Sequence, residues 1–397
     1  MFFFIVWAVI NGLARGNGYL NIFFDANGWL YFLLLFPLYW IFFAAPSSDQ
    51  AVDYYHNERF KTMLSIFTAA VIWLCFKTFF LLYVFSHNLP FVRVIYHWVR
   101  DSGIGEITLI QGGFYRVFFQ SHIYLIPAAL LFFILLFRSE FFAREKNKFA
   151  DNIKRQKLLY FLFFSLFLSV NLTTFSRSNW LGLASGSALI GAWIIYKYHA
   201  KRLVSLLALS LAALLLSVGL IAVVVKFPYP NPLGGFSTAD LLKERASQIA
   251  GEAGVSSRWS LLPELWEEIS AAPLFGRGFG ATVTYTTSDP RILAVNPKGE
   301  YTTYAFEWGW LDIWLKLGFF GLLSYFFLLA AVFIKGCERL CAHNDYPELA
   351  ALGALLAGLA AFVAVNMFSP YFNHPLGIGY LLLLVWLVDK PAERTSS

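Results

Sequence analysis

Long apolar segments alternate with short polar ones along most of the chain. Many of them reach the roughly 20 residues that a helix needs to cross the hydrocarbon core of a bilayer. The apolar segments fall near residues 1–13, 28–45, 61–86, 119–138, 158–175, 178–196, 203–226, 309–335, 348–368 and 374–389. This pattern predicts an all-α polytopic membrane protein with about ten transmembrane helices.

The longest polar interruption, residues 227–308, is predicted to be one large loop between two sets of spans, 1–226 and 309–397. It opens with a run of turn formers, PYPNPLGG, followed by a weak polar helix near 238–250. A loop of this length in a compact protein is usually functional or disordered.

An amphipathic helix is predicted inside this loop, beginning near Arg258 and ending before Pro273. Its apolar residues recur at spacings of three and four: Trp259, Leu262, Leu265, Trp266 and Ile269. Pro263 is compatible with the first turn of such a helix. The three glycines that follow, Gly276, Gly278 and Gly280, predict a flexible turn that folds over a long substrate.

Composition and charge support the membrane class. The 397 residues are 58% hydrophobic and 14% charged, whereas soluble chains carry about 25% charged residues. Much of the net charge of +6 lies in short loops, 138–157, 197–202 and 335–339. Since short basic loops stay in the cytoplasm, residues 227–308 are predicted to face outward, and no nucleic-acid partner is needed to explain the charge.

Arg177 is the clearest candidate for a functional site. It stands in TTFSRSNWLG, on a very short outward turn between two predicted spans. Charged residues at membrane depth usually mark a site, and a guanidinium fork suits a phosphate group. The alternative is an arginine that reaches to the interface and only anchors the chain.

Two further arginines belong to the predicted substrate-binding set. Arg258 at the expected helix start would place a cation where backbone N–H groups already attract anions. Arg177 and Arg258 on one outer surface would suit a pyrophosphate. Arg116, in GGFYRVFFQSH, is a weaker third, and the nearby His122 is interpreted as structural.

Glu307 is the predicted general base. It stands in YAFEWGWLDIWLKLGFFG beside Phe306 and Trp308, and such apolar surroundings raise the pKa of a carboxyl group. The alternative is a solvated residue at the rim of the loop. Asp312 and Lys316, one turn apart, are interpreted as a structural pair.

The sequence contains little that indicates a metal site or a nucleotide-binding site. Cys337, Cys341 and His343 lack a second ligand pair at zinc spacing. The chain has no GxxxxGK, HExxH or GxSxG motif and no acidic pair suited to a sugar-nucleotide metal. We therefore expect neither metal nor cofactor.

The order of these elements resembles the O-antigen ligase and O-antigen polymerase family of bacterial membrane glycosyltransferases. The matching pieces cover roughly residues 110–390 and comprise Ser176–Arg177 before WLGLASG, Arg258 before Trp266, the PLFGRGFG turn, LKLGFFGLL, and FSPYFNHPLGIGYLLLL. Family ligases carry a histidine at the entrance of the span after the long loop, where this chain has Glu307 and Trp308.

The resemblance implies transfer of a glycan from a polyprenyl-pyrophosphate donor at the outer face of the bacterial inner membrane. It implies that Arg177 and Arg258 hold the pyrophosphate, with Trp266 and Gly278 in the same substrate-binding set. The missing histidine favours a polymerase of glycan repeat units. A ligase or oligosaccharyltransferase that uses a lipid or protein acceptor is the near alternative, and a lipid-linked sugar transporter is an alternative of another class.

Overall fold

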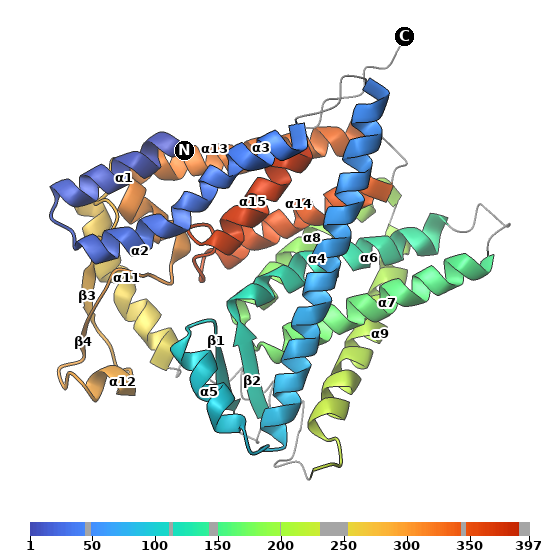
Figure 1. Ribbon diagram of the computed structural model, residues 1–397, viewed down its shortest axis with the longest axis horizontal. Helices are drawn as coiled ribbons and strands as arrows, with labels where there is room; N and C mark the ends of the chain where they lie inside the picture. The colour runs from blue at the N-terminus through green and yellow to red at the C-terminus, as the bar shows by residue number, and fades with distance from the viewer. Residues whose placement is uncertain are drawn as a thin grey trace. The chain divides into compact units, whose positions relative to one another are not determined.

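The computed structural model describes residues 1–43, 49–110, 114–142, 150–198, 200–230, 253–342 and 347–388 (Figure 1). The chain divides into two compact units. Unit 1 comprises Met1–Ala44, Glu244–Cys341 and Phe362–Ser397, and unit 2 comprises Ala45–Lys243 and Ala342–Ala361. The domain limits at 226 and 308 stay a prediction, and the helix expected near 238–250 lies outside the described residues.

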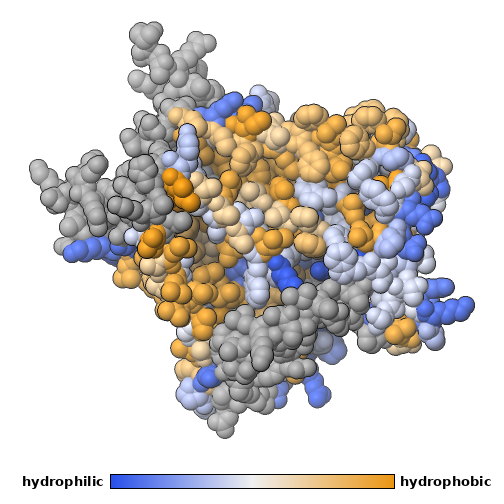
Figure 2. Space-filling view, turned by 180° about the vertical axis from the view of Figure 1, so that it is seen from behind, coloured by the Kyte–Doolittle hydropathy of each residue, from blue (hydrophilic) through white to orange (hydrophobic). Residues whose placement is uncertain are grey.

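Within the described residues, six helices are long and apolar enough to cross a membrane. They are Tyr19–Trp40, Glu58–Ser86, Gln120–Ser139, Lys154–Thr173, Val204–Val225 and Gly309–Cys341, with shorter apolar helices at Phe2–Ala14, Ala350–Val365 and Pro375–Val388. Hydrophobic residues cover much of the surface seen in Figure 2. The helical membrane class is therefore confirmed, and the number of ten spans stays a prediction.

Unit 2 is a helical bundle with one small hairpin at an end. Its elements are α4 (Asp49–Ser86), α5 (Val92–Asp101), β1 (Gly105–Ile110), β2 (Phe114–Phe119), η3 (Gln120–Tyr124), α6 (Leu125–Phe142), α7 (Ala150–Thr173), α8 (Arg177–Tyr198), α9 (Ala200–Val225) and most of α14 (Pro347–Val365). Helix α7 packs against both α6 and α9. The β1–β2 hairpin is antiparallel, with Gly105 opposite Phe119, and the hydropathy pattern did not predict it.

Small residues let the helices of unit 2 approach closely. Ala128 and Ala129 in α6 are fully buried. A Cβ atom on Gly186 of α8 would lie 2.5 Å from Leu130 Cδ1 and 3.0 Å from the carbonyl oxygen of Ala357. Small residues at such contacts are what membrane helices use to pack, because lipid gives them no hydrophobic drive to associate.

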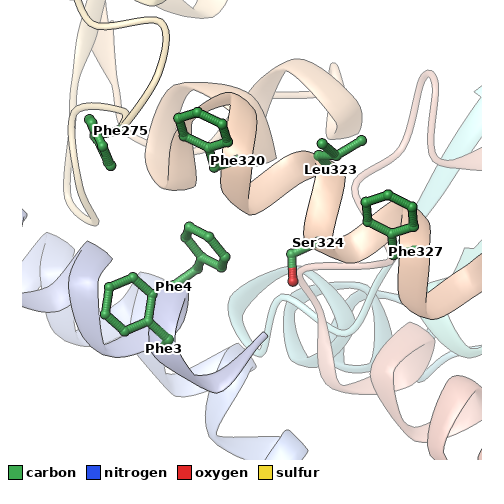
Figure 3. Close-up of a pocket in the computed structure, with 7 residues that line it drawn as sticks. All are labelled: Phe3, Phe4, Phe275, Phe320, Leu323, Ser324 and Phe327. Carbon is green, nitrogen blue, oxygen red and sulfur yellow. The ribbon is translucent and has the colours of Figure 1, made fainter.

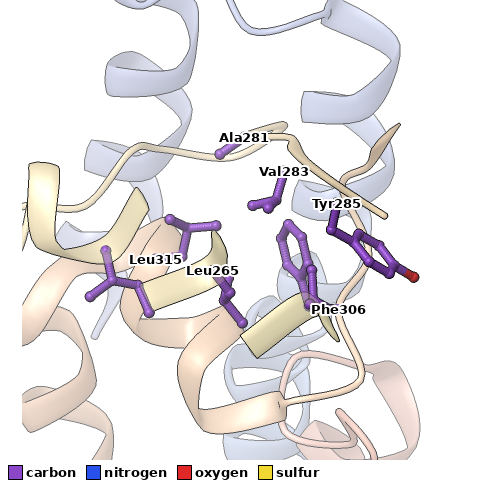
Figure 4. Close-up of a cluster of buried hydrophobic side chains, with 8 residues drawn as sticks. Leu265, Ala281, Val283, Tyr285, Phe306 and Leu315 are labelled. Atoms are coloured by element: carbon purple, nitrogen blue, oxygen red, sulfur yellow. The ribbon is translucent and has the colours of Figure 1, made fainter. Parts of the chain in front are cut away.

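Unit 1 combines helices from both ends of the chain with the second half of the long loop. Its elements are α1 (Phe2–Ala14), α2 (Tyr19–Trp29), η1 (Leu30–Leu34), α3 (Leu35–Phe43), α11 (Ala253–Ala271), β3 (Val283–Thr286), α12 (Pro290–Leu293), β4 (Glu300–Thr303), α13 (Gly309–Ala342, up to Cys341) and α15 (Pro375–Val388). Strands β3 and β4 form an antiparallel hairpin with Val283 opposite Thr303. A cluster of buried side chains joins α11, β3 and α13 (Figure 4).

Helix α11 corrects three details of the predicted amphipathic helix. It begins at Ala253, so Arg258 lies in its second turn and Pro263 in its interior. The buried stripe is Leu261, Leu265 and Ile269, while Trp259 and Trp266 are exposed. The two tryptophans were placed on the buried stripe because their spacing of seven fits it, but their rings instead pack edge-on against Trp308 and Trp314.

The glycine turn is packed on both sides, whereas a flexible turn was predicted. Gly318 has φ +75° and interrupts α13. The turn fills this break with four backbone hydrogen bonds: Arg277 N to Leu315 O, Gly278 N to Lys316 O, Phe319 N to Pro273 O, and Phe320 N to Leu274 O. Backbone groups freed by a broken membrane helix need such partners.

Helix α1 closes the other side of the turn. Phe279 N donates to Ala8 O at 2.9 Å, and Asn11 Nδ2 donates to Gly276 O at 2.9 Å. A Cβ atom on Gly278 would lie 2.2 Å from the backbone nitrogen of Gly12. The three glycines are buried with positive φ. They are therefore needed for close packing of the turn and not for its flexibility.

Candidate functional site

Arg258 and Glu307 meet in unit 1 as an ion pair. Helix α11 supplies the arginine, and the segment just before α13 supplies the glutamate. Trp308 fixes the two elements together, because its Nε1 donates to the backbone oxygen of Arg258 at 3.0 Å and its ring packs edge-on against Trp259. The sequence placed these two residues far apart along the loop and did not predict their contact.

The pair is open to solvent. The Arg258 side chain is 35% exposed and that of Glu307 is 53% exposed, whereas Phe306 beside it is buried. A neighbouring guanidinium stabilises a charged carboxylate, and the charged form is the one that accepts a proton. The sequence predicted apolar aromatic surroundings for the Glu307 carboxylate. In the structure this carboxylate contacts the Arg258 guanidinium.

Trp266 and Gly278 occupy different settings in the same unit. Trp266 is 51% exposed, and its ring packs edge-on with that of Trp314. Gly278 is buried inside the turn, so its contribution is to the position of the turn. Their predicted roles in substrate binding stay predictions.

A buried ionic network lies beneath the glycine turn. Lys316 Nζ contacts Asp312 Oδ1 at 2.7 Å, as the pair was predicted to do. It also contacts Asp25 Oδ1 at 2.7 Å and donates to Tyr304 O at 2.9 Å. The ammonium group therefore makes two hydrogen bonds, to Asp25 and Tyr304, and an ion pair with Asp312.

Asp25 is the residue of this network that sequence reasoning missed. Its Oδ2 accepts the N–H of Gly280 at 2.7 Å, so α2 is tied to both the glycine turn and α13. Asn373 donates to Asp312 on the other side of the network. The signal was present, because Asp25 is a lone carboxylate in the apolar stretch YLNIFFDANGWL, and such residues at membrane depth need a partner.

The Arg177 turn in unit 2 is held by strand β2. Arg116 Nε donates to Thr174 O at 2.7 Å, and Phe114 packs edge-on against Phe175. Phe175 has φ +46°, an uncommon conformation for a bulky residue. Backbone strain of this kind gathers at functional sites, and Arg177 follows two residues later as the first residue of α8.

Arg116 and Arg177 are close enough to influence each other. Burial lowers the pKa of Arg116, the charge of Glu106 raises it, and the charge of Arg177 lowers it. Glu106 Oε2 lies 3.6 Å from Arg116 Nη1. The Glu106 carboxylate thus lies between Arg116 and Arg100, whose Nη1 is 3.7 Å from Glu106 Oε1.

His122 has the structural role that was expected. Its Nδ1 accepts the N–H of Phe119 at 3.1 Å, so the ring proton lies on Nε2. That nitrogen lies 2.9 Å from Thr78 Oγ1, whose own hydrogen goes to Leu74 O. Both ring nitrogens are thus committed to hydrogen bonds inside unit 2.

His374 is a second titratable group near the ionic network. It stands between α14 and α15, and its Nδ1 accepts the N–H of Leu376 at 3.3 Å. Burial lowers the pKa of His374, which keeps the imidazole neutral and able to accept a proton. His374 is therefore a further candidate base in unit 1.

An apolar cavity of about 470 Å³ opens beside the glycine turn in unit 1. Phe3 and Phe4 of α1 face Phe275 of the turn and α13, whose Phe320, Leu323, Ser324 and Phe327 complete the lining (Figure 3). Five of its seven lining residues are phenylalanines, so the cavity suits a hydrocarbon chain.

No metal centre is present in the described part of the chain, since no three His, Cys, Asp or Glu side chains gather there. Independence of metal and cofactor stays a prediction.

The six long apolar helices among the described residues define a multi-pass membrane protein. Residues 160–326 match a family model described as O-antigen ligase. This match confirms the predicted resemblance to the O-antigen ligase and polymerase family over that part of the chain. No curated protein and no solved structure matches the chain.

The matched residues run from α7 into α13 and include Arg177, Arg258, Gly278 and Glu307. Arg116 and Asp25 lie outside them. The match supports, in general terms, a glycosyltransferase of the O-antigen ligase and polymerase type.

Proposed function

We propose that this protein polymerises glycan repeat units carried on a polyprenyl pyrophosphate, with its active site on the outer face of the inner membrane. The observation that carries the proposal is the pairing of Glu307 with Arg258 at the start of α13. In the resemblance drawn above, ligases of the family carry a histidine at this entrance, and here the carboxylate takes its place.

The proposed reaction forms one glycosidic bond and breaks one phosphate ester bond. The hydroxyl oxygen of the acceptor sugar attacks the anomeric carbon of the donor glycan while its proton passes to the Glu307 carboxylate. The bond between that carbon and the pyrophosphate oxygen breaks, and polyprenyl pyrophosphate leaves. Arginine guanidinium groups stabilise the negative charge that grows on the leaving oxygen.

Arg177 and Arg258 each suit the pyrophosphate in their own unit. Arg177 stands on a strained turn beside Arg116, and Arg258 stands beside the proposed base. In this scheme Arg258 releases Glu307 when the donor phosphate arrives, since a phosphate offers the guanidinium two acceptors in a matching geometry. That both arginines bind one pyrophosphate remains a prediction from the sequence.

The apolar cavity beside the glycine turn supports a lipid-linked donor. It lies in the same unit as Glu307 and is lined by α1 and α13. A polyprenyl chain is a long branched hydrocarbon, and burying such a chain against aromatic side chains contributes about 25 cal/mol per Å² of apolar surface.

Gel analysis of surface glycan in a strain that lacks the gene tests the proposal. Loss of long chains with single repeat units still attached to the final acceptor is the expected result. Full-length polymer that accumulates on its lipid carrier would instead assign the ligase or oligosaccharyltransferase function. Unchanged glycan would contradict both.

A further inference from the structure

Helix α5 in unit 2 carries a surface that neither the span pattern nor the proposed reaction explains. It begins immediately after the span Glu58–Ser86. The intervening turn folds back on that span: Asn88 has φ +49°, and Leu89 N donates to Val84 O at 3.2 Å. This is the Schellman ending of a helix, and Val92 N then donates to Leu89 O at 3.0 Å.

The short turn fixes the depth of α5. Because residues 87–91 double back on the end of α4, the helix starts within one turn of the point where the span ends. The headgroup layer is roughly 5–8 Å thick on each side of the hydrocarbon core. Helix α5 begins this close to the end of the span, beside the β1–β2 hairpin (Figure 1), so a bilayer around the span would place its start at the level of the lipid headgroups.

Helix α5 has two apolar stripes, of which only one is covered. Val99 is fully buried on the side where the helix packs against β1. Phe91, Val94 and Trp98 form a second stripe at spacings of three and four, and their side chains are 43%, 71% and 59% exposed. An exposed tryptophan next to exposed aliphatic residues is typical of a helix that lies in a membrane interface.

Basic residues occupy the remaining side of the helix. Arg93, His97 and Arg100 recur at spacings of three and four and are exposed. Arg100 is partly engaged, with Nη1 at 3.7 Å from Glu106 Oε1 and its guanidinium above the Tyr96 ring. Positive charge beside an apolar stripe fits anionic lipid headgroups above acyl chains, and long basic side chains can reach up to the phosphates.

We infer that α5 is an interfacial helix that inserts Phe91, Val94 and Trp98 among acyl chains and binds anionic phospholipid headgroups through Arg93 and Arg100. This function is independent of the proposed glycosyl transfer. It also gives the adjacent β1–β2 hairpin, which carries Arg116, a fixed position relative to the bilayer surface.

Spin-label accessibility in nanodiscs tests the insertion. The full chain, with Cys337 and Cys341 replaced by serine, receives Val94→Cys on the apolar stripe or His97→Cys on the basic side as a matched control. Each is labelled and reconstituted in phosphatidylcholine with phosphatidylglycerol. The label at 94 should collide with oxygen and not with a water-soluble nickel chelate, and the label at 97 should show the reverse.

A label at 94 that reaches the nickel chelate would overturn the proposal, because the stripe would then face water. A label at 94 shielded from both reagents would also overturn it, since a protein surface such as a second copy would then cover the stripe.

A second experiment tests whether the positive charges of Arg93 and Arg100 are needed for insertion. Replacing both Arg93 and Arg100 by glutamine should move the label at 94 toward water in discs that contain phosphatidylglycerol, whereas the double lysine variant should stay at the original depth. In discs of phosphatidylcholine alone, wild-type and glutamine forms should agree. Equal depth of all forms in both lipids would refute the binding of anionic headgroups.

Discussion

At the scale of single residues, the proposed chemistry depends on the Arg258–Glu307 pair. Glu307→Gln keeps the shape of the side chain and its contact with Arg258 while removing the base. A positioned base contributes about 10²–10⁴-fold to a rate. We therefore expect the variant to lower the transfer rate by about that factor in a reconstituted assay with a lipid-linked oligosaccharide, with donor binding close to wild type.

Glu300→Gln is the matched control for this change, since Glu300 is an exposed glutamate on β4 in the same unit. It should transfer at the wild-type rate. If Glu307→Gln is fully active while His374→Ala or Asp312→Asn is inactive, the base lies in the network below the glycine turn and not at the start of α13.

Arg177 tests the difference between a phosphate receptor and an interfacial anchor. A lysine keeps the charge but supplies no bidentate fork. Losing one hydrogen bond between charged partners costs about 1.5–3 kcal/mol, so Arg177→Lys should slow transfer at least about tenfold while the protein still inserts. Arg138→Lys, at the far end of α6, is the control. Near-full activity of Arg177→Lys would favour the anchor.

His374 gives the structure a pH dependence with a definite sign. Its ordinary pKa of 6.5 is lowered by burial in the folded protein, so the unfolded chain binds a proton more readily. The stabilising effect is complete above the ordinary value and is lost as the pH falls below it. Thermal midpoints in detergent should therefore decline from about pH 7.5 to pH 5.5, across the ordinary range for histidine.

His374→Asn separates this group from all others that titrate. The asparagine Oδ1 can accept the N–H of Leu376 in place of the histidine Nδ1, and it does not ionise. The difference between wild type and variant should shrink the decline at low pH. Identical pH profiles would mean that His374 does not distinguish the folded from the unfolded state.

Residue-scale expectations from the sequence succeeded where a short-range rule applied. The Asp312–Lys316 pair is one helical turn apart, and the structure contains it. The third member, Asp25, is 291 residues from Lys316, and no spacing rule connects positions so distant. The same holds for Arg258 and Glu307, which meet only because Trp308 and the core of unit 1 bring α11 against the start of α13.

At the scale of elements, backbone hydrogen bonds join the glycine turn to the broken helix α13. The turn supplies hydrogen-bond partners for the backbone of α13 around Gly318, and α1 packs against the other side of the turn. Sequence patterns located the helix end before Pro273 correctly, because α11 stops at Ala271. They could not show that the turn is buried, since hydropathy treats glycine and arginine as loop residues regardless of what packs on them.

Gly278→Ala measures this packing. An alanine would meet two costs: about 1–2 kcal/mol for the left-handed backbone, and about 1–3 kcal/mol for forcing a methyl group against the backbone of α1. We expect a clear loss of thermal stability in detergent and a matching loss of transfer. The overlap is with Gly12 N at 2.2 Å, so no side chain can move aside to relieve it.

Gly16→Ala is a control with the same backbone cost. Gly16 has φ +74°, and nothing lies within 4 Å of an added Cβ. It should lose only the smaller, conformational part of the stability. Equal losses at the two positions would show that φ alone matters and that the close approach of α1 does not constrain the turn.

At the scale of the whole molecule, hydropathy located most of the long helices but not their grouping. The two compact units take their helices from distant parts of the chain: unit 1 contains residues from both termini and the loop between them. The periodicity of apolar residues predicts which side chains are buried, but it does not predict which helix they pack against. The sequence did not predict the hairpins β1–β2 and β3–β4, because β1, β2 and β4 lack a strict alternation of buried and exposed positions. Strand β3 does alternate, but its four residues are the shortest length at which that signal can be recognised.

Orientation in the membrane is the remaining whole-molecule prediction, and it rests on the basic loops. A cysteine at position 290 should react with a membrane-impermeant maleimide added to intact cells or spheroplasts, and one at position 150 should react only after lysis. The native cysteines serve as internal references. Cys341 is exposed at the end of α13, on the predicted cytoplasmic side, and Cys75 is buried.

Cys341 should therefore behave like position 150, and Cys75 should remain unlabelled in the folded protein under both conditions. A background with Cys341→Ser removes its signal when the introduced cysteines are read. Labelling of position 150 in intact cells, or of Cys341 there, would reverse the orientation. Arg258 and Glu307 would then face the cytoplasm, and glycosyl transfer at the outer face could not take place at this pair.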